Sequence, residues 1–348
     1  MNFQEITEAE FKKFEEKQPQ GNIMQMAERA KLRRKMGFEC FFLGVKKDED
    51  VIAAGLLVVR YGEGWIQIGP VMDYTDIKAL DCFLEGTLDF AKEKGISEFE
   101  IFPPVLLSVR NVDGEKIKEF DQKKIFEVFS KYGFTHMGMT TEIEYKANRW
   151  MCVKDLTGLK DMNDVRATYK KNVRGHLKKL PEELEVHVLT DMNELADWAT
   201  ALDSSNEKNG VKSRNLDYYK WIWESFGDKV QFMVVRKKDD KKTVAARVVF
   251  YRPNEVVTFV SGTVQEYKKL NGMTLLQDWQ IEECLKRGIT RLNFYGLRGD
   301  FSNNNHLLEF KSGFGVMVEE YIGGFKIVLD PVKYNFGRVK RKIKTLFS

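Results

Sequence analysis

The chain has 348 residues, of which 43% are hydrophobic and 31% are charged, and its formal net charge is +4. This composition excludes a disordered chain and is typical of a soluble globular protein with about two domains. No stretch approaches the roughly 18 continuous apolar residues of a membrane-spanning helix. The N-terminus lacks the basic and then apolar pattern of a secretion signal, so a cytoplasmic protein is expected.

Cysteines and histidines are few and scattered along the chain. No two cysteines have CxxC spacing and most have apolar neighbours, so we expect reduced core residues and neither a disulfide nor a metal site. The residues concerned are Cys40, Cys82, Cys152, Cys284, His136, His176, His187 and His306.

The first half of the chain combines helix and strand patterns. A helix is expected to begin at Thr7, which can form a capping box with Glu10. A second helix is expected from Ile77, where apolar residues recur at helical spacing, to Gly95. The β-rich apolar runs that predict strands are residues 37–46, 51–61, 64–71 and 96–102.

Much the same order of elements returns later in the chain. Strands are expected at 232–237, 244–252, 255–262 and 289–296, with a helix at 275–288. The pair Ala53-Ala54 matches Ala245-Ala246 at an offset of 192, and Gly95-Ile96 matches Gly288-Ile289 at 193. A near-constant offset across a whole series of elements indicates an internal duplication.

The duplication predicts an α/β (α+β) protein of two mainly antiparallel sheets, each with helices packed against it. The order of strands, helix and further strand is that of the GCN5-like N-acyltransferase fold. We therefore expect two such domains in tandem. The first is placed at residues 1–147 together with 320–348, and the second at 148–319.

The loops that open the central helices argue against acyl-CoA as donor. In the GCN5-like fold the pyrophosphate of acyl-CoA binds backbone amides of a glycine-rich loop. The second-half loop has one glycine, Gly272, and the first-half loop at 73–81 has none. Acyl-CoA is therefore a weak donor candidate. An acyl-CoA-dependent acyltransferase is kept as an alternative to the main prediction. No GxSxG elbow and no paired nucleophile and histidine are found, so if the chain is a transferase, the acceptor must supply the nucleophile.

Lys311 lies in the segment HLLEFKSGFG, residues 306–315, after an apolar pair and before two glycines. A lysine in such a half-buried segment is either a surface residue with a buried stem or a cation directed at chemistry. Spacing alone leaves both alternatives open.

Five segments resemble the Fem family, whose FemX- and MurM-type aminoacyltransferases build interpeptide bridges of bacterial peptidoglycan. FKxxFG followed by EYIG is the most specific block, and the resemblance to armless FemX-type members runs from about residue 21 to 331. It implies tandem GCN5-like domains that transfer an amino acid from aminoacyl-tRNA to the stem-peptide lysine amine, without metal or cofactor. The segments are residues 69–95, 165–188, 209–219, 292–301 and 307–331.

The resemblance assigns catalytic roles to two neighbouring residues. Lys311 matches the lysine that stabilises the oxyanion when the ester carbonyl is attacked. A preplaced cation there is worth roughly 3–4 kcal/mol of barrier, and an anionic site would keep the lysine protonated. Phe310 is expected to shape the channel for the aminoacyl end of the tRNA.

The resemblance also implies residues that bind the muramyl-peptide precursor. Arg214 and Tyr218 match positions that hold the precursor. Arg33, with Lys31 nearby, matches a precursor-binding lysine, and a guanidinium binds diphosphate differently from an ammonium.

Three further positions depart from the family pattern. Arg29 replaces a tryptophan, and Ser108 and Val260 replace tyrosines that contact the sugar nucleotide. These departures leave the form of the precursor open.

A cluster of cations between Tyr169 and Lys179 is predicted to lie on a helix. It suits the phosphates of a tRNA acceptor stem, with a solvated helix face as the alternative. Larger family members insert a helical arm after this region, but the chain between Leu195 and 218–226 leaves no room for one. The cations are Lys170, Lys171, Arg174, Lys178 and Lys179.

From Lys333 onward the tail contains six Lys or Arg residues and no acid. Phe336, Val339, Ile343 and Phe347 recur at helical spacing. This pattern predicts a basic amphipathic helix, which either makes peripheral contact with an anionic membrane or is solvated with one docked face.

Together these patterns predict a peptidoglycan bridge aminoacyltransferase with aminoacyl-tRNA as donor. The armless chain favours UDP-MurNAc-pentapeptide as acceptor, whereas the basic tail and the missing tyrosines favour the lipid-linked form, lipid II. A non-catalytic Fem-like scaffold docked on the membrane through its tail is a further alternative.

Overall fold

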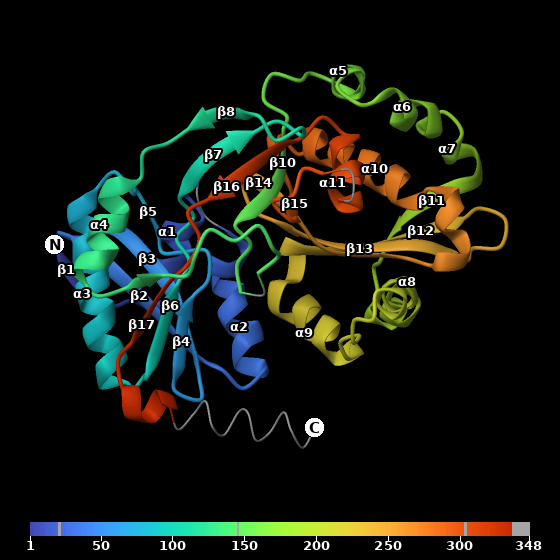
Figure 1. Cartoon of the computed structure of the whole chain (residues 1–348). Helices are drawn as coiled ribbons and strands as arrows, with labels where there is room; N and C mark the ends of the chain where they lie inside the picture. Colours follow the sequence, from blue (N-terminus) through green and yellow to red (C-terminus); the bar gives the residue numbers. More distant parts are fainter. Residues whose placement is uncertain (20–21, 145, 303–304, 336–348) are drawn as a thin grey trace. The chain divides into compact units, whose positions relative to one another are not determined.

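The computed structural model describes residues 1–19, 22–144, 146–302 and 305–335 (Figure 1). The predicted basic helix from Phe336 to Phe347 lies outside these residues. The chain divides into two compact units. The first comprises Met1–Ser108, Lys118–Arg149 and the described residues from Glu320 onward, and the second comprises Val109–Ile117 and Trp150–Glu319.

The first sheet is built from strands β1 (Asn2–Glu5), β2 (Glu39–Lys47), β3 (Asp50–Arg60), β4 (Glu63–Ile66), β5 (Val71–Met72), β6 (Glu98–Ile101), β9 (Thr135–His136) and β17 (Phe325–Val328). Among the described residues its order is β1-β2-β3-β4-β6-β17-β9, with β5 paired to β3. The predicted meander is present as antiparallel β2, β3 and β4, and β4 pairs in parallel with β6.

The helices of the first unit are α1 (Glu8–Glu15), α2 (Ala27–Lys35), α3 (Ile77–Glu93) and α4 (Lys123–Lys131). They cover both faces of the sheet because side chains of its strands alternate. Leu43 and Val45 of β2 pack with α3 and α4, whereas Phe42 packs with α1 and α2.

Both predicted helix boundaries in this unit are present. The hydroxyl of Thr7 accepts from the amide of Glu10, whose carboxylate accepts from the amide of Thr7 at 2.8 Å. Gly95, at φ +67°, follows the last residues of α3, a conformation that glycine adopts without strain.

The second sheet is built from strands β7 (Leu106–Arg110), β8 (Lys116–Glu119), β10 (Trp150–Asp155), β11 (Leu184–Val188), β12 (Val230–Lys237), β13 (Thr243–Tyr251), β14 (Glu255–Thr263), β15 (Arg291–Gly296) and β16 (Met317–Tyr321). In the described part of the chain its order is β11-β12-β13-β14-β15-β10-β16-β7-β8. As β4 does with β6, β14 pairs in parallel with β15.

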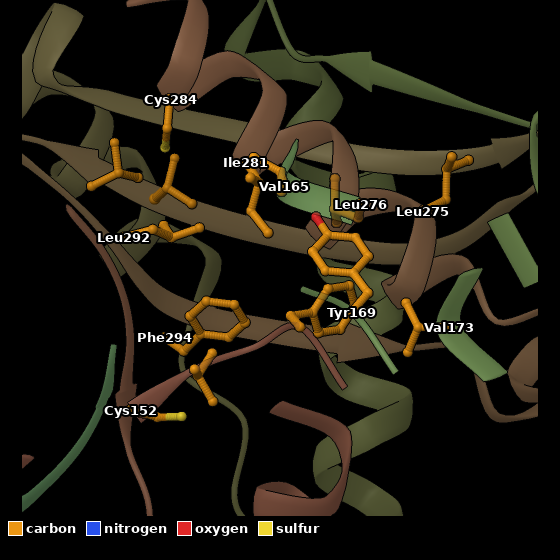
Figure 2. Packing of buried hydrophobic residues seen from close by; sticks show 14 of the residues in the cluster. Cys152, Val165, Tyr169, Val173, Leu275, Leu276, Ile281, Cys284, Leu292 and Phe294 are labelled. Carbon is orange, nitrogen blue, oxygen red and sulfur yellow. The ribbon is translucent and has the colours of Figure 1, made fainter. Parts of the chain in front are cut away.

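The helices of the second unit are α5 (Met162–Ala167), α6 (Lys171–Leu177), α7 (Leu180–Glu183), α8 (Leu195–Lys208), α9 (Leu216–Phe226), α10 (Gly272–Lys286) and α11 (His306–Ser312). In Figure 1, α10 covers one face of β12 and β13, and α8 and α9 lie on the other. Figure 2 shows the core beneath α10, where Leu276, Ile281 and Cys284 pack with Tyr169 and Leu292.

The predicted fold class is confirmed. Each half contains antiparallel strands, a central helix and a strand that pairs in parallel with the last strand of the meander. A short segment, residues 209–215, joins α8 to α9. The chain therefore has no helical arm at this place.

The helix predicted between Tyr169 and Lys179 is present but shorter than expected, since α6 covers Lys171–Leu177, with Lys170 and Lys178 at its ends. Helix α6 ends at Leu177 and α7 begins at Leu180. Pro181 lies in the first turn of α7 and has no amide hydrogen to continue the hydrogen-bond ladder of α6.

The described residues contain neither a disulfide, nor a helix that could span a membrane, nor a cluster of potential metal ligands. All four cysteines are free. Among the described residues, no helix has the length and apolar character needed to cross a membrane, and no three potential metal ligands gather at one place.

Candidate active site

A cavity of about 350 Å³ lies in the second unit where β14 and β15 separate. The two strands pair for three residues, and the last pair is Val257 with Asn293. Beyond it both strands are irregular, since the register of β14 shifts against β13 near Phe259 and that of β15 shifts against β10 before Gly296. Bulges of this kind end strand pairing and re-aim side chains. The gap that they leave is the cavity.

Lys311 lies on α11 and lines this cavity. The helix is capped by Asn305, whose Oδ1 accepts from the amide of Leu308 at 3.1 Å. Leu308 and Lys311, three residues apart, occupy the buried face of α11, with exposed fractions of 4% and 5%. The Nζ atom of Lys311 donates to the carbonyl oxygens of Tyr295 at 3.1 Å and Gly296 at 2.9 Å.

These two carbonyls belong to consecutive residues, which would normally point to opposite sides of a strand. Tyr295 has a φ of +66°, in the left-handed region, so the alternation is broken at this residue. The side chain of Asn293 fixes the turn, because its Oδ1 accepts from the amide of Tyr295 at 2.8 Å. The bulge therefore converts the end of β15 into a cradle for one ammonium group.

The cavity is electropositive. Among the described residues that line it there is neither Asp nor Glu, but Arg247 of β13 lines it together with Lys311. Burial lowers the pKa of Lys311 to about 8, and the charge of Arg247 acts in the same direction. Burial also lowers the pKa of Arg247 to about 9. Two buried cations without a carboxylate suit an incoming carbonyl oxygen that becomes an anion.

Sequence reasoning missed most of the cavity wall, including the buried polar residues Arg247, Thr258 and Gln277. Arg247 is 2% exposed, and its Nε donates to the hydroxyl of Ser261 at 3.1 Å. The one available signal was a charged residue inside the otherwise apolar segment 244–251. A neutral Gln or Thr among apolar neighbours gives no comparable signal.

Phe310, predicted to shape the channel, is half-buried and lines the cavity beside Lys311. Its ring packs against Phe314 with centroids 5.4 Å apart. Phe310 therefore supplies one aromatic part of the cavity wall from the same helix as the ammonium.

The basic segment lies beside the end of α11. The amide of Lys170 donates to the carbonyl of Gly313 at 2.9 Å, and its Nζ donates to the hydroxyl of Ser312 at 2.7 Å. The other four cations of this segment are exposed, and we call them the α6–α7 cations: Lys171, Arg174, Lys178 and Lys179.

Lys154 of β10 is a further buried lysine, 1% exposed, that the sequence did not single out. Its Nζ donates to the carbonyl of Phe314 at 2.8 Å and to the hydroxyl of Thr168 at 2.9 Å. Burial lowers its pKa to about 8. It does not line the cavity and holds the turn after α11 against the start of the basic segment.

The predicted precursor-binding residues form two groups. Arg214 and Tyr218 belong to the second unit, where the exposed guanidinium of Arg214 lies 4.4 Å from the ring centre of the buried Tyr218. Arg33 and Lys31 belong to the first unit. Arg33 donates to Oε1 of Gln67 at 3.0 Å, and Lys31 is exposed, with Nζ 3.5 Å from a carboxylate oxygen of Glu8.

The positions that depart from the family pattern are not equivalent. Ser108 is fully buried and donates to a carboxylate oxygen of Glu320 at 2.6 Å. Arg29 is 5% exposed on α2, whereas Val260 is half-buried on β14. The hydroxyl of Ser108 is therefore engaged inside the protein.

The fold and the cavity together define a tandem N-acyltransferase-like protein with a buried lysine at the strand gap of its second unit. The crystal structure of FemX has the same fold, with a TM-score of 0.82 and 15% identity, covering 97% of this chain and 99% of that chain. A tandem GNAT protein from the clavulanic acid biosynthesis pathway gives a TM-score of 0.52 and 10% identity, covering 84% of both chains.

Comparison of sequences identifies the family. Residues 6–237 and 234–342 match the FemAB family. Aminoacyltransferase FemB of Staphylococcus epidermidis is 26% identical over 419 aligned positions, covering 99% of this chain and 100% of the relative. The chain belongs to the FemAB family, as the resemblance predicted. Because the alignment is longer than the 348 residues of this chain, FemB contains segments that this chain lacks.

Proposed function

We propose that the protein transfers an amino acid from aminoacyl-tRNA to the stem-peptide lysine amine of a peptidoglycan precursor and so builds interpeptide bridges. Membership of the FemAB family and the name of its relative, aminoacyltransferase FemB, support the reaction type. The observation that carries the proposal is the Lys311 ammonium, buried in a cavity without a carboxylate among its described lining residues.

The geometry of Lys311 fits ester aminolysis. An ammonium has three N–H donors, and the carbonyls of Tyr295 and Gly296 engage two of them. The third is directed to the ester carbonyl oxygen of the donor. The lysine amine of the acceptor attacks the carbonyl carbon, and the negative charge on its oxygen is stabilised by the ammonium. Collapse forms the amide, breaks the bond to the ribose oxygen, and moves a proton from the attacking nitrogen to that oxygen.

The α6–α7 cations support tRNA as the carrier. They are exposed, and Lys170 joins their segment to Ser312, the residue after Lys311. Phosphates bound by these cations would place the carrier next to the helix that holds the catalytic ammonium.

The precursor is proposed to bind through Arg33 and Lys31 in the first unit and Arg214 and Tyr218 in the second. Exposed or partly exposed cations are suited to phosphate and carboxylate groups. UDP-MurNAc-pentapeptide is the proposed acceptor, with lipid II as the alternative.

An acyl-CoA donor is disfavoured at α10. A Cβ at Gly272 would lie 2.8 Å from a methyl carbon of Val244. This glycine is therefore explained by close packing of the helix on the sheet, and it is not needed for the approach of a pyrophosphate.

The test uses the full chain with a mixture of charged tRNAs and either UDP-MurNAc-pentapeptide or lipid II. We expect the precursor to gain the mass of one aminoacyl residue, and the gain to disappear with uncharged tRNA. A mass gain from acyl-CoA and none from charged tRNA would assign the protein to the other reaction.

A further inference from the structure

Three polar side chains beside Lys311 are almost fully buried and carry atoms without a hydrogen-bond partner among the described residues. Gln277 is 0% exposed, Arg247 2% and Thr258 8%. The unpartnered atoms are both amide atoms of Gln277, Nη1 of Arg247 and the hydroxyl of Thr258. A buried polar atom without a partner is destabilising and rare. Three such side chains on one cavity indicate a site that a ligand completes.

These side chains come from three different elements. Arg247 lies on β13, Thr258 on β14 just beyond the last pair with β15, and Gln277 on α10. Arg247 shares a face of β13 with Ala245, two residues before it, and Ala245 packs in the core beneath α10. The three groups therefore face the same space from the strand side and the helix side.

The unpartnered atoms restrict the chemistry of the ligand. Nη1 of Arg247 donates, the amide of Gln277 donates and accepts, and the hydroxyl of Thr258 does both. A hydroxyl group on the ligand satisfies both kinds of atom. A carboxylate only accepts, a methyl group does neither, and an ammonium would meet the positive charges of Arg247 and Lys311.

Burial also restricts the part of the substrate that can reach these atoms. A phosphodiester group is bonded to the rest of the nucleic acid on both sides, so it cannot reach polar atoms that are buried in the cavity wall. An amino acid side chain has a free end and can reach them. The ester carbonyl would lie at Lys311, on the same cavity. The side chain attached to the neighbouring carbon is the group that can extend to the wall.

We infer that Arg247, Thr258 and Gln277 form the pocket for the side chain of the transferred amino acid and select a hydroxyl group, as in a seryl or threonyl residue. The inference rests on the proposed function and specifies its donor. Loss of the hydroxyl would leave the three groups buried without a partner, as in enzymes that reject an analogue lacking one hydrogen-bonding group.

The first measurement compares kcat/KM for seryl-, threonyl-, alanyl-, glycyl- and aspartyl-tRNA with the wild-type chain. We expect the hydroxyl-bearing donors to exceed alanyl-tRNA by about ten- to a hundredfold, the range for one unsatisfied buried group. Alanyl-, glycyl- or aspartyl-tRNA used as well as seryl-tRNA overturns the inference and leaves the proposed function intact.

Two variants test the residues. Gln277→Met and Thr258→Val remove unpartnered polar atoms at nearly constant volume, so we expect unchanged or higher melting temperatures together with a seryl-to-alanyl preference below about threefold. The control is Gln280→Met, one turn further along α10. Gln280 is also 0% exposed but does not line the cavity, and its Nε2 donates to the hydroxyl of Tyr251 at 3.2 Å. This variant should lower the melting temperature and keep the preference.

The second measurement separates the pocket from the reaction. Adenosine carrying a seryl or alanyl group through a 3′-amide resists hydrolysis, and its binding is measured by calorimetry. One outcome is that the seryl compound binds to the wild-type chain but not to Gln277→Met, while no charged tRNA is turned over. This outcome would support the side-chain pocket and contradict the proposed function. If both compounds bind equally, or if Gln277→Met leaves the preference for the seryl compound unchanged, the assignment of these residues to a side-chain pocket is wrong.

Discussion

The ammonium of Lys311 lies 3.1 Å from the carbonyl oxygen of Tyr295, the residue whose left-handed backbone breaks the alternation of β15. Together with Gly296, this residue holds two of the three N–H groups of the ammonium. The orientation of the third is thus set by a strand bulge and not by a carboxylate. The cation is fixed in place while its charge stays unneutralised, which is what stabilisation of an oxyanion requires.

This relationship predicts different effects for two substitutions of Tyr295. Both Tyr295→Gly and Tyr295→Val remove the ring, but only glycine adopts a φ of +66° freely. We expect the free energy of unfolding of Tyr295→Val to be about 1–2 kcal/mol lower than that of Tyr295→Gly. We also expect Tyr295→Val to have the lower kcat. Urea denaturation and initial rates measure both quantities. Equal stability and equal kcat would show that the bulge is not needed.

The second prediction concerns pH. The pKa of Lys311 is lowered to about 8 by burial, with Arg247 contributing. The ammonium that we propose as the catalytic group therefore loses its proton as pH rises through about 8, and kcat/KM should fall there. Arg247→Met removes a like charge, which raises the pKa of Lys311 and moves the fall to higher pH, whereas Arg247→Lys keeps the charge and should move it less. Rates corrected for spontaneous hydrolysis of the ester give the profile. A fall at the same pH in all three proteins contradicts the coupling.

Much of the fold could be predicted from the sequence because local signals agreed with one another. The capping box of Thr7, the apolar period of α3 and the repeated order of strands each identify elements without tertiary information. The helix of the basic segment is shorter than predicted: α6 ends at Leu177, before the last two cations, and Pro181, two residues after Lys179, has no amide hydrogen to extend it. The spacing of the cations carries no signal for this boundary, whereas the proline does.

The candidate site was predictable in part. The motif around Lys311 identified the residue as a candidate. Its hydrogen-bond partners are backbone carbonyl oxygens, which no pattern of side chains in the sequence can predict. The bulge at Tyr295 and the separation of β14 from β15 depend on tertiary structure. They produce no periodic pattern of apolar residues from which they could be predicted. Arg247 and Gln277 line one cavity only when β13 and α10 fold together, so their shared position could not be inferred from residues 30 positions apart.

The third prediction concerns the carrier RNA. Replacement of the four α6–α7 cations by Gln should weaken tRNA binding and reduce the slope of log K against log salt by about 3, since each neutralised phosphate contributes roughly 0.7–0.9. The matched control replaces four exposed lysines of β8 and α4 by Gln and should leave the slope unchanged. These are Lys116, Lys118, Lys123 and Lys124. Identical slopes for both variants would remove the α6–α7 cations from the RNA site.

The fourth prediction concerns the precursor. Arg214→Ala removes an exposed guanidinium that lies over Tyr218, so we expect the KM for the precursor to rise about tenfold, as for a lost charged hydrogen bond, with the KM for tRNA unchanged. Lys220→Ala, on the helix α9 that follows Arg214, is the control and should change neither. If the precursor KM of Arg214→Ala equals that of the control, Arg214 does not contact the precursor.

The most direct test of the account is the single-turnover rate of amide formation in Lys311→Met, measured with charged tRNA and saturating precursor. Removal of the ammonium should slow this step about 10²–10³-fold, while the Kd of the precursor, measured separately, changes less than threefold. A rate near that of the wild-type chain, with the precursor bound normally, would show that the buried cation takes no part in the chemistry.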